Sequence, residues 1–272
     1  MSRRRVRLDA ALVNRGLARS RGEARELVDA GRVTIAGAPA TKVATLVAAD
    51  EALVVADDGP RWASRGGGKL DGALDRLRVP VAGRYALDAG ASTGGFTDVL
   101  LARGAARVVA VDVGYGQLDW RLASDERVVV LDRTNVRHLE PDALPPPPPD
   151  LVVADLSFIS LAMVIPALVR VAAPGADHVL LCKPQFEAGR GQVPRDGVVR
   201  DQAVWLAALR NVVEAGQASG LGLIGAVPSP VRGPAGNVEF FVHLRAASTA
   251  EDATAAETAL QSAVDEAAGA QR

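Results

Sequence analysis

The segment from Leu87 to Asp98 constrains the fold of this chain more than any other. An apolar run ending in Asp88 leads into a glycine-rich turn, and the residues beyond the turn predict a helix. In doubly wound α/β proteins, small residues at such a turn let the backbone approach a ligand at the helix N-terminus. A second apolar run, 107–112, ends in Asp112, whose carboxylate is suited to hold a ribose diol. These features predict a site for an adenosine-type cofactor.

From Tyr85 onwards the chain alternates predicted strands and helices. We expect strands at 84–88, 107–112, 127–132, 150–155 and 178–183, and helices at 96–103, 160–172 and 201–219. Two later runs, 221–227 and 238–245, fit an antiparallel pair that closes the sheet. This alternation predicts an α/β fold: a mainly parallel, Rossmann-like sheet with helices on both faces.

The N-terminal region has a different character. A chain of 272 residues has room for one α/β domain of about 200 residues and a small second module. Residues 6–56 predict a short helix closed by Gly16, a second helix capped by Ser20, and short strands at 33–35 and 53–55. Within residues 1–50, ten Lys and Arg residues face five acidic ones, which indicates a polyanionic partner.

Several features limit the class of protein. Cys182 is the only cysteine, so neither an internal disulfide nor a thiolate zinc cluster can form, and we expect no metal. No signal peptide and no apolar run of about 18 residues is apparent, so we expect a cytoplasmic protein without a membrane span.

The turn itself favours one cofactor. A nicotinamide site usually carries Gly-x-Gly-x-x-Gly, whereas here the strand ends in Asp88, which would repel a pyrophosphate. An acid at this position can bind the amino acid part of S-adenosylmethionine, and the closing antiparallel pair also fits a methyltransferase sheet. Asp132, after the third strand, either accepts a hydrogen bond from the adenine amino group or caps a helix. We therefore expect S-adenosylmethionine.

The polar residues at the strand ends favour methylation of a hydroxyl group. Asp155 follows the fourth strand without the Asp/Asn-Pro-Pro-aromatic turn of amino-group methyltransferases. Cys182 precedes Lys183 on a strand, so their side chains point to opposite faces and Cys182 belongs to the core. Lys69, Asp155, Lys183 and Glu239 remain. A partly neutral lysine can accept a hydroxyl proton while carboxylates orient it.

These motifs resemble the TlyA family of ribosomal RNA 2′-O-methyltransferases, also called haemolysin A, whose catalytic domain is similar to FtsJ/RrmJ. The matching runs are Ser64–Leu70, Asp88–Asp98, Asp112–Leu118, Asp155–Leu161, Lys183–Glu187 and Gly236–Glu239. The N-terminal region, called the head below, resembles a small RNA-binding domain first seen in a ribosomal protein. The matching residues are Arg7-Leu8-Asp9, Ser20-Arg21 and Gly31-Arg32-Val33.

The resemblance implies a catalytic Lys-Asp-Lys-Glu tetrad at Lys69, Asp155, Lys183 and Glu239, with Lys183 as the base. The expected cofactor-binding residues are Asp88, Gly90, Ser92, Thr93, Gly94, Gly95, Phe96, Asp112, Val113, Gly116, Gln117, Asp132, Arg133 and Asp155. The expected RNA-binding residues are Arg3, Arg4, Arg5, Arg7, Arg15, Arg19, Arg21, Arg25 and Arg65. The implied activity is cytidine 2′-O-methylation of 16S and 23S rRNA within 30S and 50S subunits, with sensitivity to capreomycin-type antibiotics. The sequence does not reveal the oligomeric state, and we favour a monomer.

We expect four segments: an RNA-binding domain at 1–59, a linker at 60–68, a methyltransferase domain at 69–246 and an acidic, Ala-rich tail at 247–272 that is weakly helical or disordered. The linker carries Trp62 one position away from the family's Arg-x-Trp-Val pattern. Residues 66–68 are expected to form a hinge that couples docking of the head to the placement of Lys69. Two alternatives are a noncatalytic ribosome assembly factor and a membrane-active haemolysin.

Overall fold

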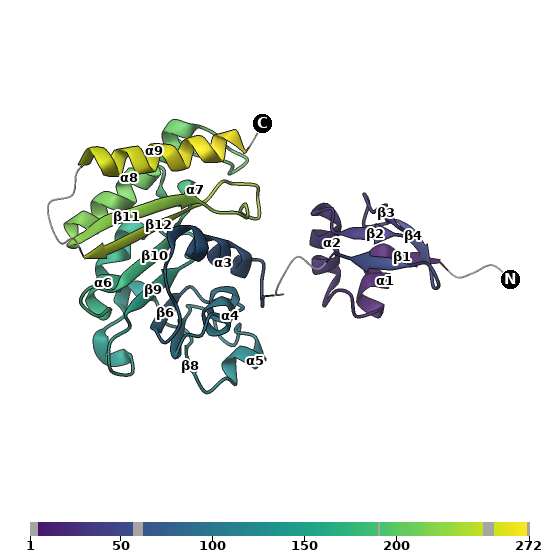
Figure 1. Cartoon of the computed structure of the whole chain (residues 1–272), viewed down its shortest axis with the longest axis horizontal. Coiled ribbons are helices and arrows are strands. Elements are labelled where there is room, and N and C mark those ends of the chain that lie inside the picture. Colours follow the sequence, from purple (N-terminus) through teal and green to yellow (C-terminus); the bar gives the residue numbers. More distant parts are fainter. Residues whose placement is uncertain (1–4, 57–61, 190, 247–252, 271–272) are drawn as a thin grey trace. The chain divides into compact units, whose positions relative to one another are not determined.

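The computed structural model describes residues 5–56, 62–189, 191–246 and 253–270 (Figure 1). The chain divides into two compact units, 1–61 and 62–272.

The first unit is a small α+β module. Its elements are β1 (Arg5–Arg7), α1 (Leu8–Asn14), α2 (Arg21–Asp29), β2 (Val33–Ile35), β3 (Ala38–Pro39), β4 (Leu46–Ala48) and β5 (Leu53–Val55). β1 pairs with β4, and β2 lies between β3 and β5. The predicted cap of α2 is confirmed, because Ser20 Oγ accepts a hydrogen bond from Glu23 N at 3.2 Å. Leu8, Leu12 and Val33 lie at the centre of its core.

The described part of the second unit contains a seven-stranded sheet in the order β11-β12-β10-β9-β6-β7-β8. Its strands are β6 (Tyr85–Ala89), β7 (Arg107–Val111), β8 (Val128–Leu131), β9 (Leu151–Ala154), β10 (Asp177–Cys182), β11 (Leu221–Pro228) and β12 (Phe240–Ala246). β6 to β10 pair in parallel, while β12 is antiparallel to both β10 and β11. The predicted α/β fold, including its closing antiparallel pair, is confirmed.

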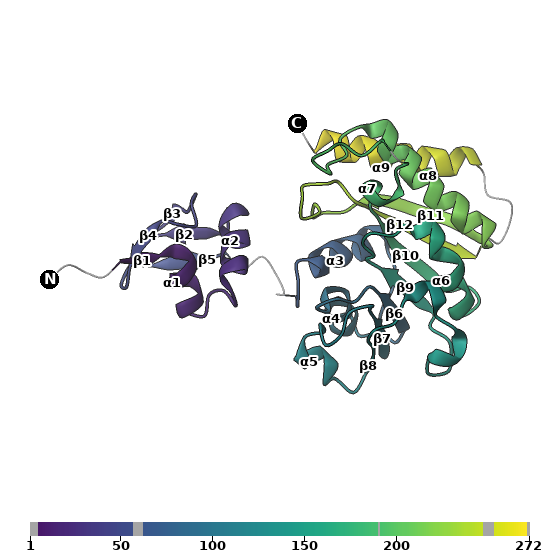
Figure 2. The same ribbon diagram turned by 180° about the vertical axis from the view of Figure 1, so that it is seen from behind.

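Helices cover both faces of this sheet. They are α3 (Gly66–Leu77), α4 (Gly95–Ala102), α5 (Trp120–Ala123), α6 (Ile165–Val171), α7 (Pro184–Glu187), α8 (Gln202–Ala218) and α9 (Ala253–Gly269), with 3₁₀ turns η1 (Val136–His138), η2 (Pro141–Ala143) and η3 (Leu161–Met163). α3 and α4 pack on one face (Figure 1) and α6 and α8 on the other (Figure 2). The helix expected at 160–172 is divided into η3 and α6, because Pro166 in the first turn of α6 has no N–H to continue a helix.

Helix α3 corrects the expectation of a hinge. The three glycines at 66–68 form its first turn, and Leu70, Ala73 and Leu74 bury its apolar face. A Cβ on Gly67 would lie 2.3 Å from Trp62 Cγ, so the indole requires glycine at this position. Glycine is a poor helix former, which is why the sequence concealed the start of this helix.

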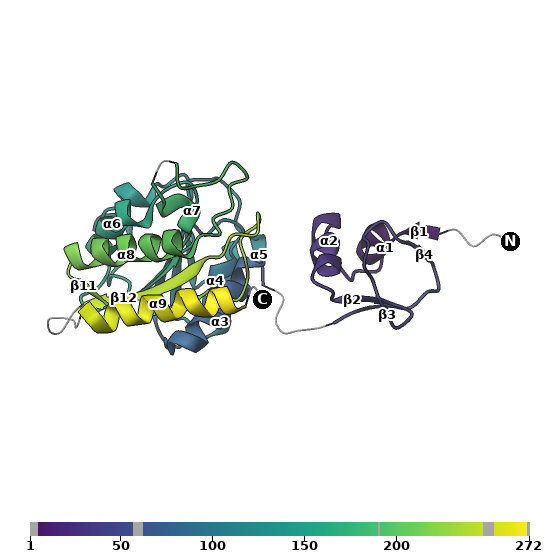
Figure 3. The same ribbon diagram turned by 90° about the horizontal axis from the view of Figure 1, so that it is seen from above.

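The C-terminal tail forms the well-packed helix α9. Its buried residues Leu260, Ala263, Val264 and Ala267 recur at helical spacing and join the core that contains α8. α9 lies along β11, the strand at one edge of the sheet (Figure 3). It therefore covers an edge that would otherwise expose unpaired backbone groups. Ion pairs join Glu257 to Arg210 on α8 and Glu266 to Arg76 on α3.

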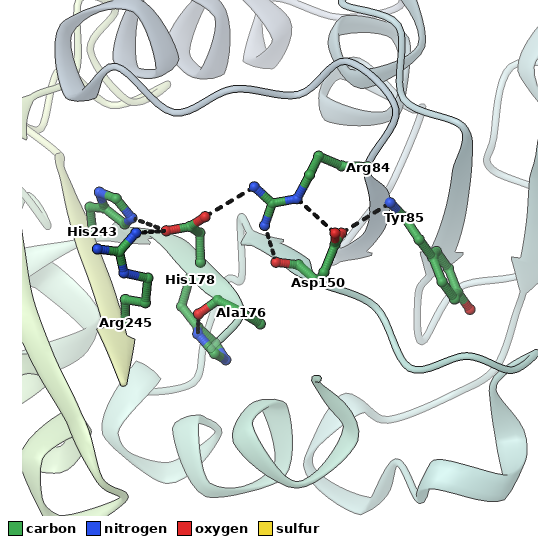
Figure 4. Close-up of polar contacts among 8 residues, drawn as sticks. Arg84, Tyr85, Asp150, Ala176, His178, His243 and Arg245 are labelled. Carbon is green, nitrogen blue, oxygen red and sulfur yellow. Dashed lines mark hydrogen bonds and ion pairs between the residues drawn. The ribbon is translucent and has the colours of Figure 1, made fainter. Parts of the chain in front are cut away.

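A charged network ties together the strand ends farthest from the glycine-rich turn (Figure 4). Asp177 binds His243 Nε2 at 2.8 Å and Arg84 Nη1 at 3.1 Å, and Arg84 Nε lies 2.9 Å from Asp150. Burial acts to raise the pKa of Asp177, but hydrogen bonds from His243 and Arg84 outweigh it and lower the pKa. The neighbouring His178 is buried, which lowers its pKa to about 4. The network therefore joins β6, β9, β10 and β12.

Candidate active site

A cavity of about 490 Å³ opens at the carboxyl ends of the parallel strands. Its walls are the first turns of α3, the turn after β6, the loops after β9 and β10, and the segment that precedes β12. Ligands of open α/β sheets bind at this end of the strands. The volume is in the range of small-molecule sites.

The four residues expected to form the tetrad all line this cavity. Lys183 directly follows β10 and Glu239 directly precedes β12, and these strands pair with Cys182 opposite Phe240. Asp155 follows β9, the other neighbour of β10. The strand order therefore accounts for three of the four positions. Lys69 is contributed by the second turn of α3, the helix that the sequence concealed.

The tetrad consists of two ion pairs that differ in exposure. Lys69 Nζ lies 2.6 Å from Glu239 Oε2, and these side chains are only 5% and 1% exposed. Lys183 Nζ lies 2.5 Å from Asp155 Oδ1, and the Asp155 side chain is 22% exposed. Lys183 also donates a hydrogen bond to Ser157 Oγ at 3.1 Å. The Lys183 pair is therefore the one more accessible to a substrate.

The turn after β6 brings the backbone close to this pair. A Cβ on Gly90 would lie 2.5 Å from the carbonyl oxygen of Asp155, and one on Gly95 would lie 2.2 Å from Ser64 Oγ. Gly90 also has φ 86°, which other residues rarely adopt. Ser92, Thr93 and Phe96 line the cavity beside them. Gly94 lies behind the turn, where a Cβ would meet Leu122.

Asp88 does not line the cavity, and its expected contact with a cofactor stays a prediction. The side chain is completely buried and accepts a hydrogen bond from Thr97 Oγ1 at 2.7 Å. Burial raises the pKa of Asp88 to about 7, and the carboxylates of Asp155 and Asp112 act in the same direction. Among the described residues, Asp88 Oδ1 has no hydrogen-bond partner. Asp88 therefore anchors α4 beneath the turn.

The acids after the next two strands organise loops beside the turn. Asp112 accepts hydrogen bonds from Ser92 N at 2.8 Å and Gly114 N at 2.7 Å, and Asp132 accepts one from Gly116 N at 2.8 Å. η1 is capped by Asn135, so capping by Asp132 is not needed there. The other expected cofactor residues of this region, Val113, Gln117 and Arg133, are exposed and lie outside the cavity lining. The Arg133 guanidinium lies 4.3 Å from the centre of the Tyr115 ring.

The expected RNA-binding arginines differ in availability. Arg3 and Arg4 lie outside the described residues. Arg5, Arg7, Arg15, Arg19, Arg21 and Arg25 are all exposed on the first unit. Arg15 nevertheless donates to the carbonyl oxygens of Ala48, Ala49 and Glu51, and Arg7 pairs with Asp9 at 3.0 Å. Arg65 belongs to the second unit, is exposed and lines the cavity.

Sequence reasoning did not single out several residues of the cavity wall. Ser157 contacts Lys183, and Phe158 is 92% exposed with φ 64°. Phe186 packs against Phe158 with ring centroids 5.2 Å apart. Both Ser157 and Phe158 lie in a run that matched the family pattern, but a backbone conformation of this kind has no signature in one sequence.

Comparisons with known proteins agree with this arrangement. Residues 62–246 match the FtsJ-like methyltransferase family, and residues 6–53 match the S4 domain. The chain belongs to the FtsJ-like methyltransferase family. The resemblance and the expected enzyme class, a methyltransferase, are thereby confirmed.

Relatives cover most of the chain. A 16S/23S rRNA (cytidine-2′-O)-methyltransferase TlyA from Mycobacterium tuberculosis is 58% identical over 89% of this chain and 90% of its own length. Hemolysin A from Brachyspira hyodysenteriae is 34% identical over 88% of this chain and 99% of its own length. A solved structure from Streptococcus thermophilus is 35% identical, covers 98% of each chain and has a TM-score of 0.76. Within the described residues of our protein, no helix is both long and apolar enough to cross a membrane.

Proposed function

We propose that this protein transfers a methyl group from S-adenosylmethionine to the ribose 2′-hydroxyl of cytidine in 16S and 23S rRNA. The observation that carries the proposal is the pairing of Lys183 with Asp155 and of Lys69 with Glu239 around one cavity beside the glycine-rich turn. Relatives that include an rRNA cytidine-2′-O-methyltransferase support the substrate.

The turn after β6 fits the cofactor. Gly90 lets the turn pack directly against the backbone of Asp155, and Gly90, Thr93 and Phe96 all line the cavity. These residues would hold S-adenosylmethionine together with the loops that Asp112 and Asp132 organise. When bound, the cofactor supplies a methyl group on a positively charged sulfur. Asp88 contributes indirectly, by fixing α4 beneath the turn.

In this proposal Lys183 Nζ takes the proton that the ribose 2′-hydroxyl loses when its oxygen is methylated. An amine can accept a proton only in its neutral form, so Lys183 must be deprotonated before the transfer. Asp155 and Ser157 both contact Lys183 Nζ and orient it. Lys69 and Glu239 balance each other's charge in the buried wall, so this wall adds no net charge opposite the substrate.

The first unit is proposed to bind rRNA of the 30S and 50S subunits in the cytoplasm. It matches the S4 domain and exposes a set of arginines, which can neutralise phosphates. Arg65 supplies a positive charge at the cavity itself. The family resemblance leads us to expect that loss of the protein lowers sensitivity to capreomycin-type antibiotics, and we favour a monomer.

Transfer of labelled methyl groups to purified 30S and 50S subunits tests the proposal. Alkali cleaves RNA only where the 2′-hydroxyl is free, so a ribose-methylated product leaves a labelled, alkali-resistant dinucleotide. We expect such a dinucleotide ending in the residue after a cytidine, from both subunits. Label that alkali releases as single nucleotides would contradict ribose methylation, and absence of label would favour a noncatalytic assembly factor.

A further inference from the structure

Glu187 is a partly buried carboxylate that neither lines the cavity nor forms an ion pair with a described residue. It is the last residue of α7, the short helix that directly follows Lys183. Its oxygens accept hydrogen bonds from Leu161 N at 2.6 Å, Ser160 Oγ at 2.5 Å and Asn211 Nδ2 at 3.3 Å. All three donors are uncharged.

Holding a carboxylate in this environment has a cost in free energy. Burial raises the pKa of Glu187, although its hydrogen bonds act in the opposite direction. A buried charge without a cationic partner is unfavourable unless it accepts several well-formed hydrogen bonds. Because an apolar side chain would fill the same space without this cost, the hydrogen bonds of Glu187 call for an explanation beyond packing.

The explanation lies in the two segments that Glu187 joins. Loop 155–161 follows β9 and carries Asp155, Ser157 and Phe158, and segment 183–187 follows β10 and carries Lys183. Within the cavity these segments meet through Lys183 with Asp155 and Ser157, and through Phe158 with Phe186. Glu187 ties their far ends together, outside the cavity, and its contact with Asn211 anchors both to α8.

This far tie acts on a loop that contains a residue in a strained backbone conformation. Phe158 has a left-handed backbone, which is unfavourable for a residue with a side chain and persists only when its surroundings enforce it. Ser160, whose hydroxyl binds Glu187, also caps η3 by accepting a hydrogen bond from Ala162 N at 3.1 Å. Glu187 thus fixes the point at which the loop enters η3.

We propose that Glu187 is a positioning residue, which holds loop 155–161 against α7 and so sets Asp155 and Ser157 around Lys183 Nζ. The proposal rests on the proposed function, in which Lys183 is the base. Glu187 itself does not touch the substrate. Its removal is therefore expected to slow the chemical step without weakening the binding of either substrate.

Steady-state kinetics of three variants test this role. We expect Glu187→Ala to lower kcat about tenfold or more, because small displacements of a reacting group cost that much. The KM values for S-adenosylmethionine and for 50S subunits should stay within about twofold. Glu187→Gln should recover most of the activity, since its amide oxygen can accept from Leu161 N while its amide group donates to Ser160 Oγ. The matched control is Asp201→Ala, which removes a carboxylate that caps α8 by accepting from Ala203 N at 2.8 Å. It should lower stability and leave kcat unchanged.

Wild-type kcat in a folded Glu187→Ala variant would overturn the proposal, as would a Gln variant no more active than the Ala variant. If Glu187→Ala does not fold, Ser160→Ala removes one of the same hydrogen bonds and should lower kcat about threefold. Hydrogen exchange separates this proposal from the proposed function, because it needs no turnover. Amides of 155–161 should exchange faster in Glu187→Ala than in the wild type, and unchanged exchange would contradict the tie even in a protein inactive on rRNA.

Discussion

Lys69 and Glu239 are separated by 170 positions in the sequence, yet their side chains form an almost completely buried ion pair at 2.6 Å. The pair joins α3 to the start of β12, two elements that lie far apart in the sequence of the second unit. Removing one partner leaves the other charge buried without compensation, which is far more destabilising than removing both.

We therefore predict that Glu239→Ala lowers the free energy of unfolding by about 3–5 kcal/mol. The double variant Lys69→Met/Glu239→Leu should recover a large part of this loss, because it leaves no uncompensated charge. Chemical denaturation measures the free energy of unfolding of Glu239→Ala, of Lys69→Met and Glu239→Leu singly, and of the double variant. Additive losses in the double variant would show that the two charges do not depend on each other.

Asp88 should make stability fall as pH rises. Its folded-state pKa is about 7, above the ordinary value of 3.8, so between these values the folded protein holds a proton that the unfolded chain has released. Its contribution to the free energy of unfolding is therefore complete below pH 4 and is lost as pH rises to 7. The total loss is about 4 kcal/mol. In Asp88→Asn this loss should be absent from the pH dependence of the unfolding free energy.

Asp125 provides the opposite control for this measurement. Hydrogen bonds from Arg127 lower the pKa of Asp125 to about 2, so its contribution is present above the ordinary pKa and is lost as pH falls towards 2. The slope removed by Asp125→Asn should thus have the reverse sign. Equal slopes in the wild type and Asp88→Asn between pH 4 and 7 would contradict the buried state of Asp88.

The network around Asp177 predicts a loss of stability without a change in the chemical step. Asp177→Ala removes the partner of His243 and Arg84 at the strand ends farthest from the cavity and should cost about 3–5 kcal/mol. Below its melting temperature the variant should keep wild-type kcat. Asp196→Ala, which breaks the exposed pair with Arg200, should cost less than about 1 kcal/mol. Thermal unfolding and kcat are measured for both variants. A loss of stability in Asp177→Ala as small as that in Asp196→Ala would rule out a stabilising role for the network.

Two arginines of the first unit should behave differently. Arg25 is exposed on α2, so Arg25→Ala should weaken binding to ribosomal subunits. The slope of log affinity against log salt concentration should become shallower by about one. Arg15 donates hydrogen bonds to three backbone carbonyl oxygens, so Arg15→Ala should chiefly destabilise the first unit. Binding titrations at several salt concentrations, with thermal unfolding, distinguish these roles. A flat salt response of the wild type would contradict an electrostatic RNA footprint.

The features that sequence could predict are those encoded locally. β9 and the part of β10 from residue 179 to 182 are buried on both faces and therefore appear as uninterrupted apolar runs. The ends of these runs identified Asp155 and Lys183. Helix α3 escaped notice because it begins with three glycines, of which Gly67 is required by the close packing of Trp62, a tertiary contact.

Two further features of the structure have tertiary causes that the sequence does not reveal. The sequence places Asp88 at the end of a strand but does not reveal that Thr97 turns the carboxylate into the core. The contacts of Glu187 come from two separate segments, so no local pattern could assign it a role. Distances across the sheet edge had to come from the structure.

In the proposed mechanism Lys183 Nζ takes the proton of a ribose 2′-hydroxyl. The most direct test of this step compares Lys183→Ala with the wild type in a single-turnover assay on 50S subunits, with S-adenosylmethionine binding measured in parallel. We predict that the variant binds the cofactor as the wild type does but forms the alkali-resistant methylated dinucleotide at least about a hundredfold more slowly. Methylation at the wild-type rate would show that another group accepts the proton and would contradict the account.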